Sequence, residues 1–152
     1  MSEFESPRFD KLSIIVFSGD FDRVHYSLVT ASAAAAIDIP VTLFFTMAAS
    51  RALLAPIDGG PPAWRNLPSG DSGTMGDNGG AIDDGFKART VADFESLMGA
   101  CVALDVKFMV CDMGLRALDM EGVQLRDDVI IESGGMVTFL MDASATGQML
   151  LI

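Results

Sequence analysis

The residues of this chain that most readily do chemistry near neutral pH are its two cysteines and its one histidine. Cys111 ends an apolar run, KFMVC at residues 107–111, and a helix-like segment begins at Asp112. A thiol between a strand and a helix N-terminus is well placed for reactivity, because free backbone N–H groups there favour the thiolate. Asp112 has the opposite effect, since a neighbouring carboxylate disfavours a negative sulfur. Two interpretations of Cys111 stay open, a reactive thiol and an inert core cysteine.

Cys101 and His25 each allow two interpretations. Cys101 falls on the apolar face of the helix expected before the Cys111 strand, so it is either a small core side chain or a resolving thiol for Cys111. His25 falls on the first expected helix, one turn past its start. It either faces the strand ends, where it would assist a thiol or an anion, or is an ordinary half-buried residue.

Open parallel sheets bind ligands at the carboxyl ends of their strands, so residues at those ends are the candidate pocket. Ser18, Gly19 and Asp20 follow the first expected strand, and Thr46 lies at the end of the second. These residues could hold an anion at a helix N-terminus, although Asp20 also fits a plain helix cap. Arg116 could steady an anionic sulfur, but it lies off the helical face that Cys111 would occupy.

Signatures of common cofactor and metal sites are absent from the sequence. There is no GxGxxG segment, no Walker loop and no CxxC pair. One histidine and two separated cysteines do not readily complete a zinc site in one chain. We therefore predict no metal and no cofactor.

Composition restricts the partners and the compartment. The chain has 152 residues and a formal net charge of −11, from 21 acidic and 10 basic residues, which is the wrong sign for binding nucleic acid. Mean hydropathy is high, at +0.38, but Asp38 and Pro40 interrupt the most apolar region, residues 26–50, so we expect no stable membrane span. The polar start of the chain does not resemble a signal peptide, and two cysteines suit a reducing compartment, so we expect a cytoplasmic protein.

Strand-like and helix-like segments alternate along the chain, which predicts an α/β fold with a mostly parallel sheet of about five strands between helical layers. The expected strands are residues 12–17, 41–47, 107–111, 129–131 (a short strand or an extended link) and 148–152. The expected helices include residues 22–37, 48–54, 91–104, a helix opening at Asp112, and 136–143. The length predicts a single domain over residues 1–152.

Residues 56–90 interrupt this alternation with a concentration of glycine and proline. We interpret this segment as a long surface excursion that is disordered or mobile, or else serves as a lid or an oligomer contact. Trp64 and Phe86 are its only aromatic residues and its expected packing anchors.

Three segments, SIIVFSGDFDR, ASAAAAIDIPVTLFFTM and FMVCDMGLRAL, resemble in order and spacing the DsrE/DsrF/DrsH-like (TusD-like) family of sulfur-relay proteins. The C-terminal GGMVTFLMDASATGQMLLI resembles the closing helix and strand of that family. The resemblance covers most of the chain apart from the excursion and the first ten residues. It implies a three-layer α/β/α domain that assembles as a homotrimer or homohexamer.

The resemblance also implies a function, that of an intracellular sulfur carrier or sulfurtransferase. In the sulfur-transferring members one cysteine on a strand-to-helix turn carries a persulfide, and Cys111 matches that place. Cys101 could match the second, upstream cysteine of some members. The implied partners are donor and acceptor proteins that carry thiols.

Other functions stay open beside the sulfur relay. The chain could be a small-ligand or anion-binding module that uses Ser18, Gly19, Asp20 and Thr46, or a non-catalytic oligomeric scaffold in which Cys111 is buried. Some relatives are described as peroxiredoxin-like, but neither cysteine lies in the P-x-x-x-S/T-x-x-C loop that peroxiredoxins share. We therefore do not expect a thiol peroxidase.

Overall fold

The computed structural model describes residues 9–70 and 73–152, so Asp71, Ser72 and the first eight residues lie outside the described residues. Five parallel strands form one sheet in the order β4-β3-β2-β1-β5. The strands are β1 (Leu12–Val16), β2 (Val41–Phe45), β3 (Lys107–Cys111), β4 (Ile131–Gly134) and β5 (Gln148–Leu151). The predicted parallel sheet of about five strands is confirmed, although β4 begins where the expected fourth strand ended.

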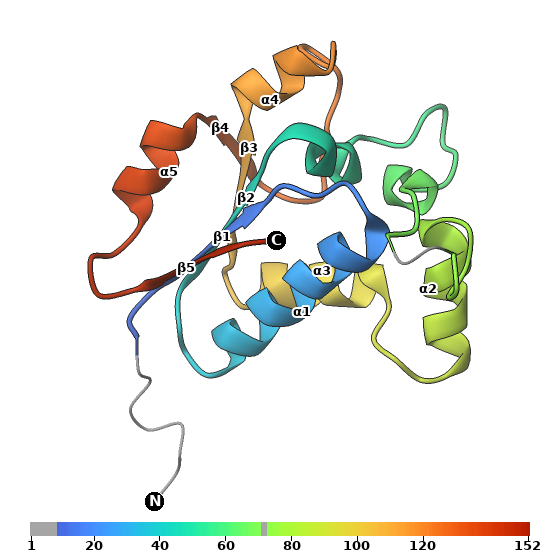
Figure 1. Ribbon diagram of the computed structural model, residues 1–152, viewed down its shortest axis with the longest axis horizontal. Helices are drawn as coiled ribbons and strands as arrows, with labels where there is room; N and C mark the ends of the chain where they lie inside the picture. Colours follow the sequence, from blue (N-terminus) through green and yellow to red (C-terminus); the bar gives the residue numbers. More distant parts are fainter. Residues whose placement is uncertain (1–8, 71–72) are drawn as a thin grey trace, which may run out of the picture.

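Helices cover both faces of the sheet (Figure 1). α1 (Phe21–Ala36) and α3 (Phe94–Ala103) pack against each other on one face, whereas α5 (Met136–Asp142) lies on the other. Successive residues of a strand point to opposite faces, so in β1 the side chain of Ile14 joins the α1 side and that of Ile15 the α5 side. This two-sided burial explains the continuous apolar runs in the sequence.

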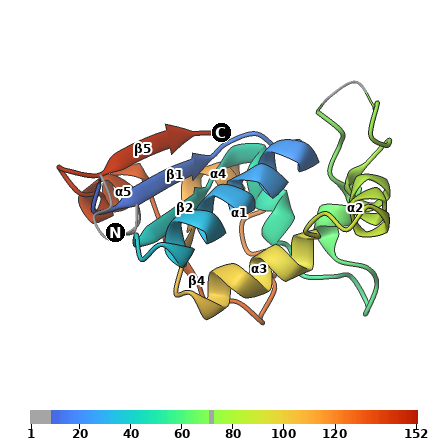
Figure 2. The same ribbon diagram turned by 90° about the horizontal axis from the view of Figure 1, so that it is seen from below.

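The order in which strands join the sheet determines which loops meet. The chain adds β2, β3 and β4 on one side of β1, and α5 then leads back so that β5 pairs with β1 on its other side (Figure 2). Two short helices, η1 (Met47–Leu53) after β2 and α4 (Asp112–Ala117) after β3, contact each other at the carboxyl ends of these strands. This contact brings the ends of β2 and β3 together.

The excursion is more ordered than we predicted, because it contains η2 (Ala63–Asn66) and α2 (Gly79–Ala88). α2 begins with two of the glycines of the excursion, Gly79 and Gly80. The side chain of Asn78 caps this helix by accepting a hydrogen bond from Ala81 N at 3.0 Å, and the helix then buries Ile82. Capping and burial together outweigh the low helix propensity of the glycines.

Aromatic side chains hold the excursion against the layer formed by α1 and α3. Trp64 stacks on Phe94 with ring centroids 4.5 Å apart, and Phe86 lies 4.7 Å from the ring of His25. Trp64 and Phe86 are therefore the packing anchors that the sequence predicted.

A buried carboxyl group lies between α2 and α3 and makes the stability of this region depend on pH. Asp83 is 0% exposed; its Oδ1 accepts a hydrogen bond from Phe94 N at 2.8 Å, and its Oδ2 has no partner among the described residues. Burial raises the pKa of Asp83, so the folded protein holds this proton more tightly than the unfolded chain. The contribution of this group to stability is therefore present at low pH and is lost as the pH rises through the folded-state pKa.

Replacing Asp83 with asparagine should remove this pH dependence while keeping an acceptor for Phe94 N. As the pH rises from about 4 to about 7, the free energy of unfolding of the variant should increase relative to that of the wild type by roughly 1 kcal/mol, or about 2–4 °C in Tm. Thermal unfolding of both proteins across this range measures the difference. A difference in Tm that stays constant with pH would show that Asp83 is charged in both states.

Candidate functional site

Cys111 occupies the junction between β3 and α4 that its sequence predicted. It is the last residue of β3 and the N-cap residue of α4, with an extended backbone. Its Sγ accepts a hydrogen bond from Gly114 N at 3.4 Å. The local backbone thus directs one N–H group at the sulfur.

The start of α4 packs closely against the end of β2, which places Thr46 and Met47 next to Cys111. A Cβ atom built on Gly114 would lie 2.6 Å from Met47 N and 3.0 Å from Thr46 Oγ1. Only glycine allows this approach. Thr46, Met47, Cys111 and Gly114 are called the strand-end cluster below.

Met47 adds backbone strain to the strand-end cluster. Its φ of 51° lies in the left-handed region, which residues other than glycine, asparagine and aspartate rarely adopt. Such strain persists where the surrounding structure enforces it, often at functional sites. The sequence placed Met47 at the end of the expected second strand, residues 41–47, but carried no signal for its left-handed φ.

Gly114→Ala should displace the strand-end cluster. Because the new methyl group meets the backbone of Met47 rather than a flexible side chain, we expect a loss of about 1–3 kcal/mol in the free energy of unfolding. Gly99→Ala is the matched control, since a Cβ there meets no atom within 4 Å. Urea denaturation of both variants compares them, and equal stabilities would contradict the close approach.

The thiol itself is covered. Cys111 is 2% exposed and lies in an apolar cluster with Phe44, Met109 and Phe139 on the α5 side of the sheet. The ring of Phe139 stacks on that of Phe44 with centroids 4.9 Å apart. Phe139 is the one fully buried side chain of α5, whereas Met141 of the same helix is 81% exposed. The buried ring of Phe139 thus holds the middle of α5 over this cluster.

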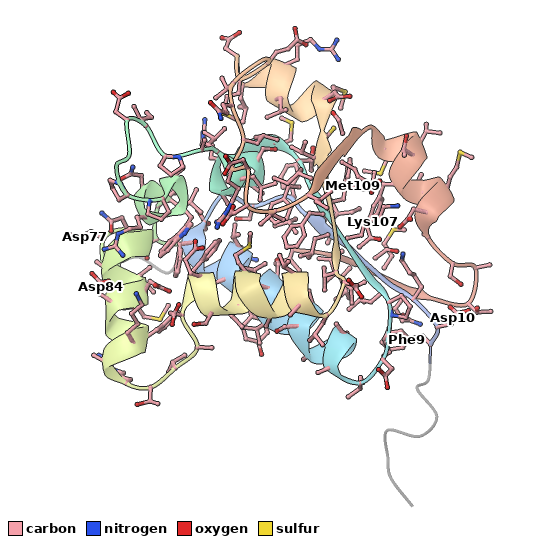
Figure 3. The ribbon with its side chains drawn as sticks, turned by 180° about the vertical axis from the view of Figure 1, so that it is seen from behind. Phe9, Asp10, Asp77, Asp84, Lys107 and Met109 are labelled. Atoms are coloured by element: carbon pink, nitrogen blue, oxygen red, sulfur yellow. The ribbon has the colours of Figure 1, made fainter. Side chains whose placement is uncertain are left out.

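Asp142 fastens the C-terminal end of α5 to the sheet. Its carboxylate accepts a hydrogen bond from Thr42 Oγ1 at 2.6 Å and pairs with Lys11 and Lys107, each at 3.0 Å. Burial alone would raise the pKa of Asp142, but the Thr42 hydrogen bond and the two lysines outweigh it and lower the pKa to about 2. Figure 3 shows Lys107 and Met109 along β3 on the side of α5. Phe139 and Asp142 together are called the α5 fastening.

Asp112, which we expected to work against a thiolate, has a partner of its own. Ser133 Oγ on β4 donates a hydrogen bond to Asp112 Oδ1. The pairing of β3 with β4 brings Ser133 to this place, since Val110 and Ser133 are register partners. Ser133 carried no signal in the sequence, because the neighbour of β3 was not predicted.

Several backbone N–H groups of the loop of Ser18, Gly19 and Asp20 are occupied. Ser18 N donates to Ile152 O and Asp20 N donates to Ser18 Oγ, each at 3.2 Å. The next backbone amide, Phe21 N, donates to Pro68 O of the excursion at 2.9 Å. Four cavities of the described chain, of about 560, 340, 200 and 250 Å³, are lined by residues outside this loop.

The remaining candidates lie away from the strand-end cluster. His25 is buried, and its Nε2 lies 2.8 Å from Ala92 O among the aromatic rings that hold the excursion. Arg116 is exposed and pairs with Glu121 at 3.6 Å. Of the predicted pocket residues, Thr46 approaches Gly114 of the strand-end cluster, and Gly19 approaches Ala48, the residue after Met47.

Cys101 lies on the opposite face of the sheet from Cys111. Its Sγ is 3.8 Å from Leu28 O between α3 and α1, and it belongs to the larger core. Burial raises the pKa of the Cys101 thiol to about 12, so this thiol stays protonated. The two cysteines belong to different cores in the fold described, and Cys101 is a core side chain there.

Two general features bear on the class of site. Across residues 9–70 and 73–152, no three histidine, cysteine, aspartate or glutamate side chains gather in a way that could hold a metal ion. Within the same residues, no helix has the length and apolarity needed to cross a membrane.

Comparison with known proteins supports the fold. No model of a known protein family matches the chain. The protein named "Uncharacterized protein YrkE" of Bacillus subtilis (strain 168) is 26% identical over 147 residues, covering 88% of this chain and 91% of that protein. The crystal structure of the ychN protein of E. coli matches with a TM-score of 0.52 and 13% identity, over 93% of this chain and 97% of that one. The ychN protein is a DsrE-like fold protein, and this chain shares the DsrE-like α/β/α fold.

Proposed function

We propose that this protein is a sulfur carrier, or sulfurtransferase, that holds sulfane sulfur as a persulfide on Cys111. The observation that carries the proposal is the place of the Cys111 sulfur. It lies at a strand end of a DsrE-like fold, on a helix N-cap, and accepts a backbone N–H from Gly114 at 3.4 Å. An attacking thiolate needs such a donor, and so does the thiolate that departs when sulfur is passed on.

The proposed reaction is two exchanges at sulfur without net oxidation. The Cys111 thiolate attacks the terminal sulfur of a donor persulfide, so a new S–S bond forms on Cys111, the donor S–S bond breaks, and the donor leaves as a thiolate. An acceptor thiolate then attacks the terminal sulfur on Cys111 and takes it, and Cys111 leaves as the thiolate. Protons return to the departing thiolates from solvent.

Access to Cys111 requires α5 to move, because the thiol is covered beneath Phe139. We propose that α5 opens locally and that the α5 fastening sets how often it does so. One buried aromatic ring and one carboxylate are few contacts for a helix. Local opening of α5 should therefore cost less free energy than global unfolding of the protein.

The proposed partners are thiol-bearing donor and acceptor proteins in the cytoplasm. The net charge of −11 favours encounter with basic partners. We further propose a homotrimer or homohexamer, joined through the exposed apolar side chains along β1 and β5, Phe17, Met149 and Leu151. β5 is an edge strand, and edges with exposed apolar residues favour pairing.

The transfer step can be tested with the purified protein. After loading with polysulfide and removal of the excess, addition of a small thiol should release hydrogen sulfide from the wild type and from Cys101→Ala, but not from Cys111→Ser. Release that is equal in all three proteins would rule out Cys111 as the carrier.

A non-catalytic scaffold of the same fold is the second candidate. The observation that favours it is the 2% exposure of Cys111, which a buried core cysteine would share. A scaffold predicts that native Cys111 resists alkylation as strongly as Cys101 does. The carrier predicts that Cys111 is alkylated at a rate set by the opening of α5.

A further inference from the structure

A groove on the far side of η1 from the strand ends has no role in the sulfur chemistry. It begins as a cavity of about 560 Å³ between residues 52–64 and residues 124–128. It continues into a second cavity of about 340 Å³, which shares four wall residues with the first: Leu54, Ala55, Pro56 and Ala63. Cavities of this size accommodate ligands of several residues or a drug-sized molecule. The two together are called the acidic groove below.

The polar wall of the acidic groove is held in one geometry. Glu95 Oε2 accepts hydrogen bonds from Trp64 Nε1 at 2.7 Å and from Arg126 Nη1 at 3.0 Å. Arg126 also donates through Nε and Nη2 to Asp128, at 2.7 Å each, and its side chain is only 11% exposed. The carboxylates are thus fixed before any ligand arrives, which reduces the entropy lost on binding.

The groove carries a net negative charge. In the first cavity, Glu95, Asp127 and Asp128 contribute three negative charges and Arg126 contributes one positive charge, which leaves two negative charges. Arg51 lines the second cavity, so one negative charge remains for the groove as a whole. Burial alone would raise the pKa of Glu95, but hydrogen bonds from Arg126 and Trp64 outweigh it and lower the pKa. The Arg126 hydrogen bond likewise lowers the pKa of Asp128. These carboxylates are therefore ionised at neutral pH.

The second cavity has a different character. Its lining is mostly apolar and includes Ile57, Pro61, Leu67 and Val123 beside the shared residues, and Arg51 and Asn66 are its polar members. An occupant that fills both cavities would best present a positive group in the first and an apolar group in the second, on either side of the shared wall residues.

We infer that the acidic groove docks an extended segment of a partner protein that places a lysine or arginine side chain in the first cavity and an apolar side chain in the second. The negative charge of the first cavity favours the basic residue, and the apolar lining of the second cavity favours the apolar residue. In an extended segment, alternate side chains point to the same side, so one intervening residue separates the two. The inference is independent of Cys111, because the groove residues do not include the strand-end cluster.

Trp64 provides the probe, because it is the only tryptophan of the chain and lines the first cavity. We would titrate the full-length protein with acetyl-Arg-Ala-Leu-amide and follow the indole N–H signal of Trp64 by NMR. The signal should shift saturably with this peptide. Acetyl-Glu-Ala-Leu-amide should leave it unchanged, and acetyl-Arg-Ala-Ser-amide should bind more weakly.

Two charge-reversal variants locate the binding. Asp127→Lys should weaken binding of the arginine peptide by at least about fivefold, since Asp127 lines the first cavity. Asp77→Lys changes the net charge equally but lies beyond the groove, at the α2 end of the molecule (Figure 3), and should change binding less than twofold. Cys111→Ser should bind like the wild type. Equal shifts with the arginine and glutamate peptides, equal effects of the two reversals, or no binding at all would overturn the inference.

Discussion

Phe139→Ala should increase the rate at which Cys111 reacts with an alkylating reagent by at least about tenfold, because it removes the only fully buried side chain that holds α5 over the thiol. Truncating a fully buried phenylalanine also costs about 3–5 kcal/mol of global stability. The rate would be measured under native conditions in a Cys101→Ala background, so that Cys111 is the only thiol. Phe139→Leu keeps an apolar plug and should give an intermediate rate.

Phe94→Ala is the matched control for this prediction. Phe94 is as deeply buried as Phe139, but it packs in the core on the α1 side of the sheet. Its truncation should lower global stability by a similar amount without uncovering Cys111 locally. If both variants accelerate alkylation equally, Cys111 reacts through global unfolding, and local opening of α5 is contradicted.

Asp142→Asn should lower the free energy of unfolding at neutral pH by about 2–4 kcal/mol. The variant leaves Lys11 and Lys107 without their shared carboxylate, and the side chain of Asp142 is itself largely buried. The same variant should accelerate alkylation of Cys111, because the end of α5 is no longer fastened. Urea denaturation measures the change in stability, and alkylation of the same sample measures access to Cys111. An unchanged alkylation rate would show that Asp142 does not control access to the thiol.

The effect of Asp142 has a defined pH window. Its folded-state pKa of about 2 lies below its ordinary value of 3.8, so its contribution to stability is present above the ordinary value and is lost as the pH falls through the folded value. The difference in stability between the wild type and Asp142→Asn should therefore shrink between about pH 4 and pH 2. A difference that stays constant over this interval would mean that the lysines do not pair with the carboxylate.

Much of the sheet could be predicted from the sequence because its strands are buried on both faces. A largely apolar run such as residues 107–111 indicates a strand that is covered on both faces. Such a run can be recognised without knowing which strands pair with it. The order of the strands could not be predicted in the same way. It determines that Ser133 meets Asp112 and that the 18–20 loop meets Ile152.

The ends of α1 and α3 were predicted to within one residue, at 37 and 104, whereas the start of α3 was expected at Val91 and lies at Phe94. No glycine marks the two ends. Asp38 and Asp105 adopt left-handed φ values of 65° and 61° there, a conformation that glycine usually adopts after a helix. In the excursion the opposite occurs, because Gly79 and Gly80 begin α2 under the cap of Asn78.

One part of the candidate site could be predicted from the sequence and another part could not. The place of Cys111 could be predicted, because adjacent residues in the sequence show the change from an apolar strand to the start of a helix. Its cover was not predictable, because Phe139 reaches Phe44 only through the crossover of α5. His25 was ambiguous for a similar reason, since its partner Ala92 lies beyond the excursion.

The central claim, that Cys111 carries sulfane sulfur, is tested most directly by intact mass after incubation with polysulfide. The wild type and Cys101→Ala should gain about 32 Da for each sulfur atom, and Cys111→Ser should gain none. Phe139→Ala should gain the same mass faster. No added mass on the wild type or on Phe139→Ala, where the thiol is uncovered, would contradict the claim and favour the scaffold.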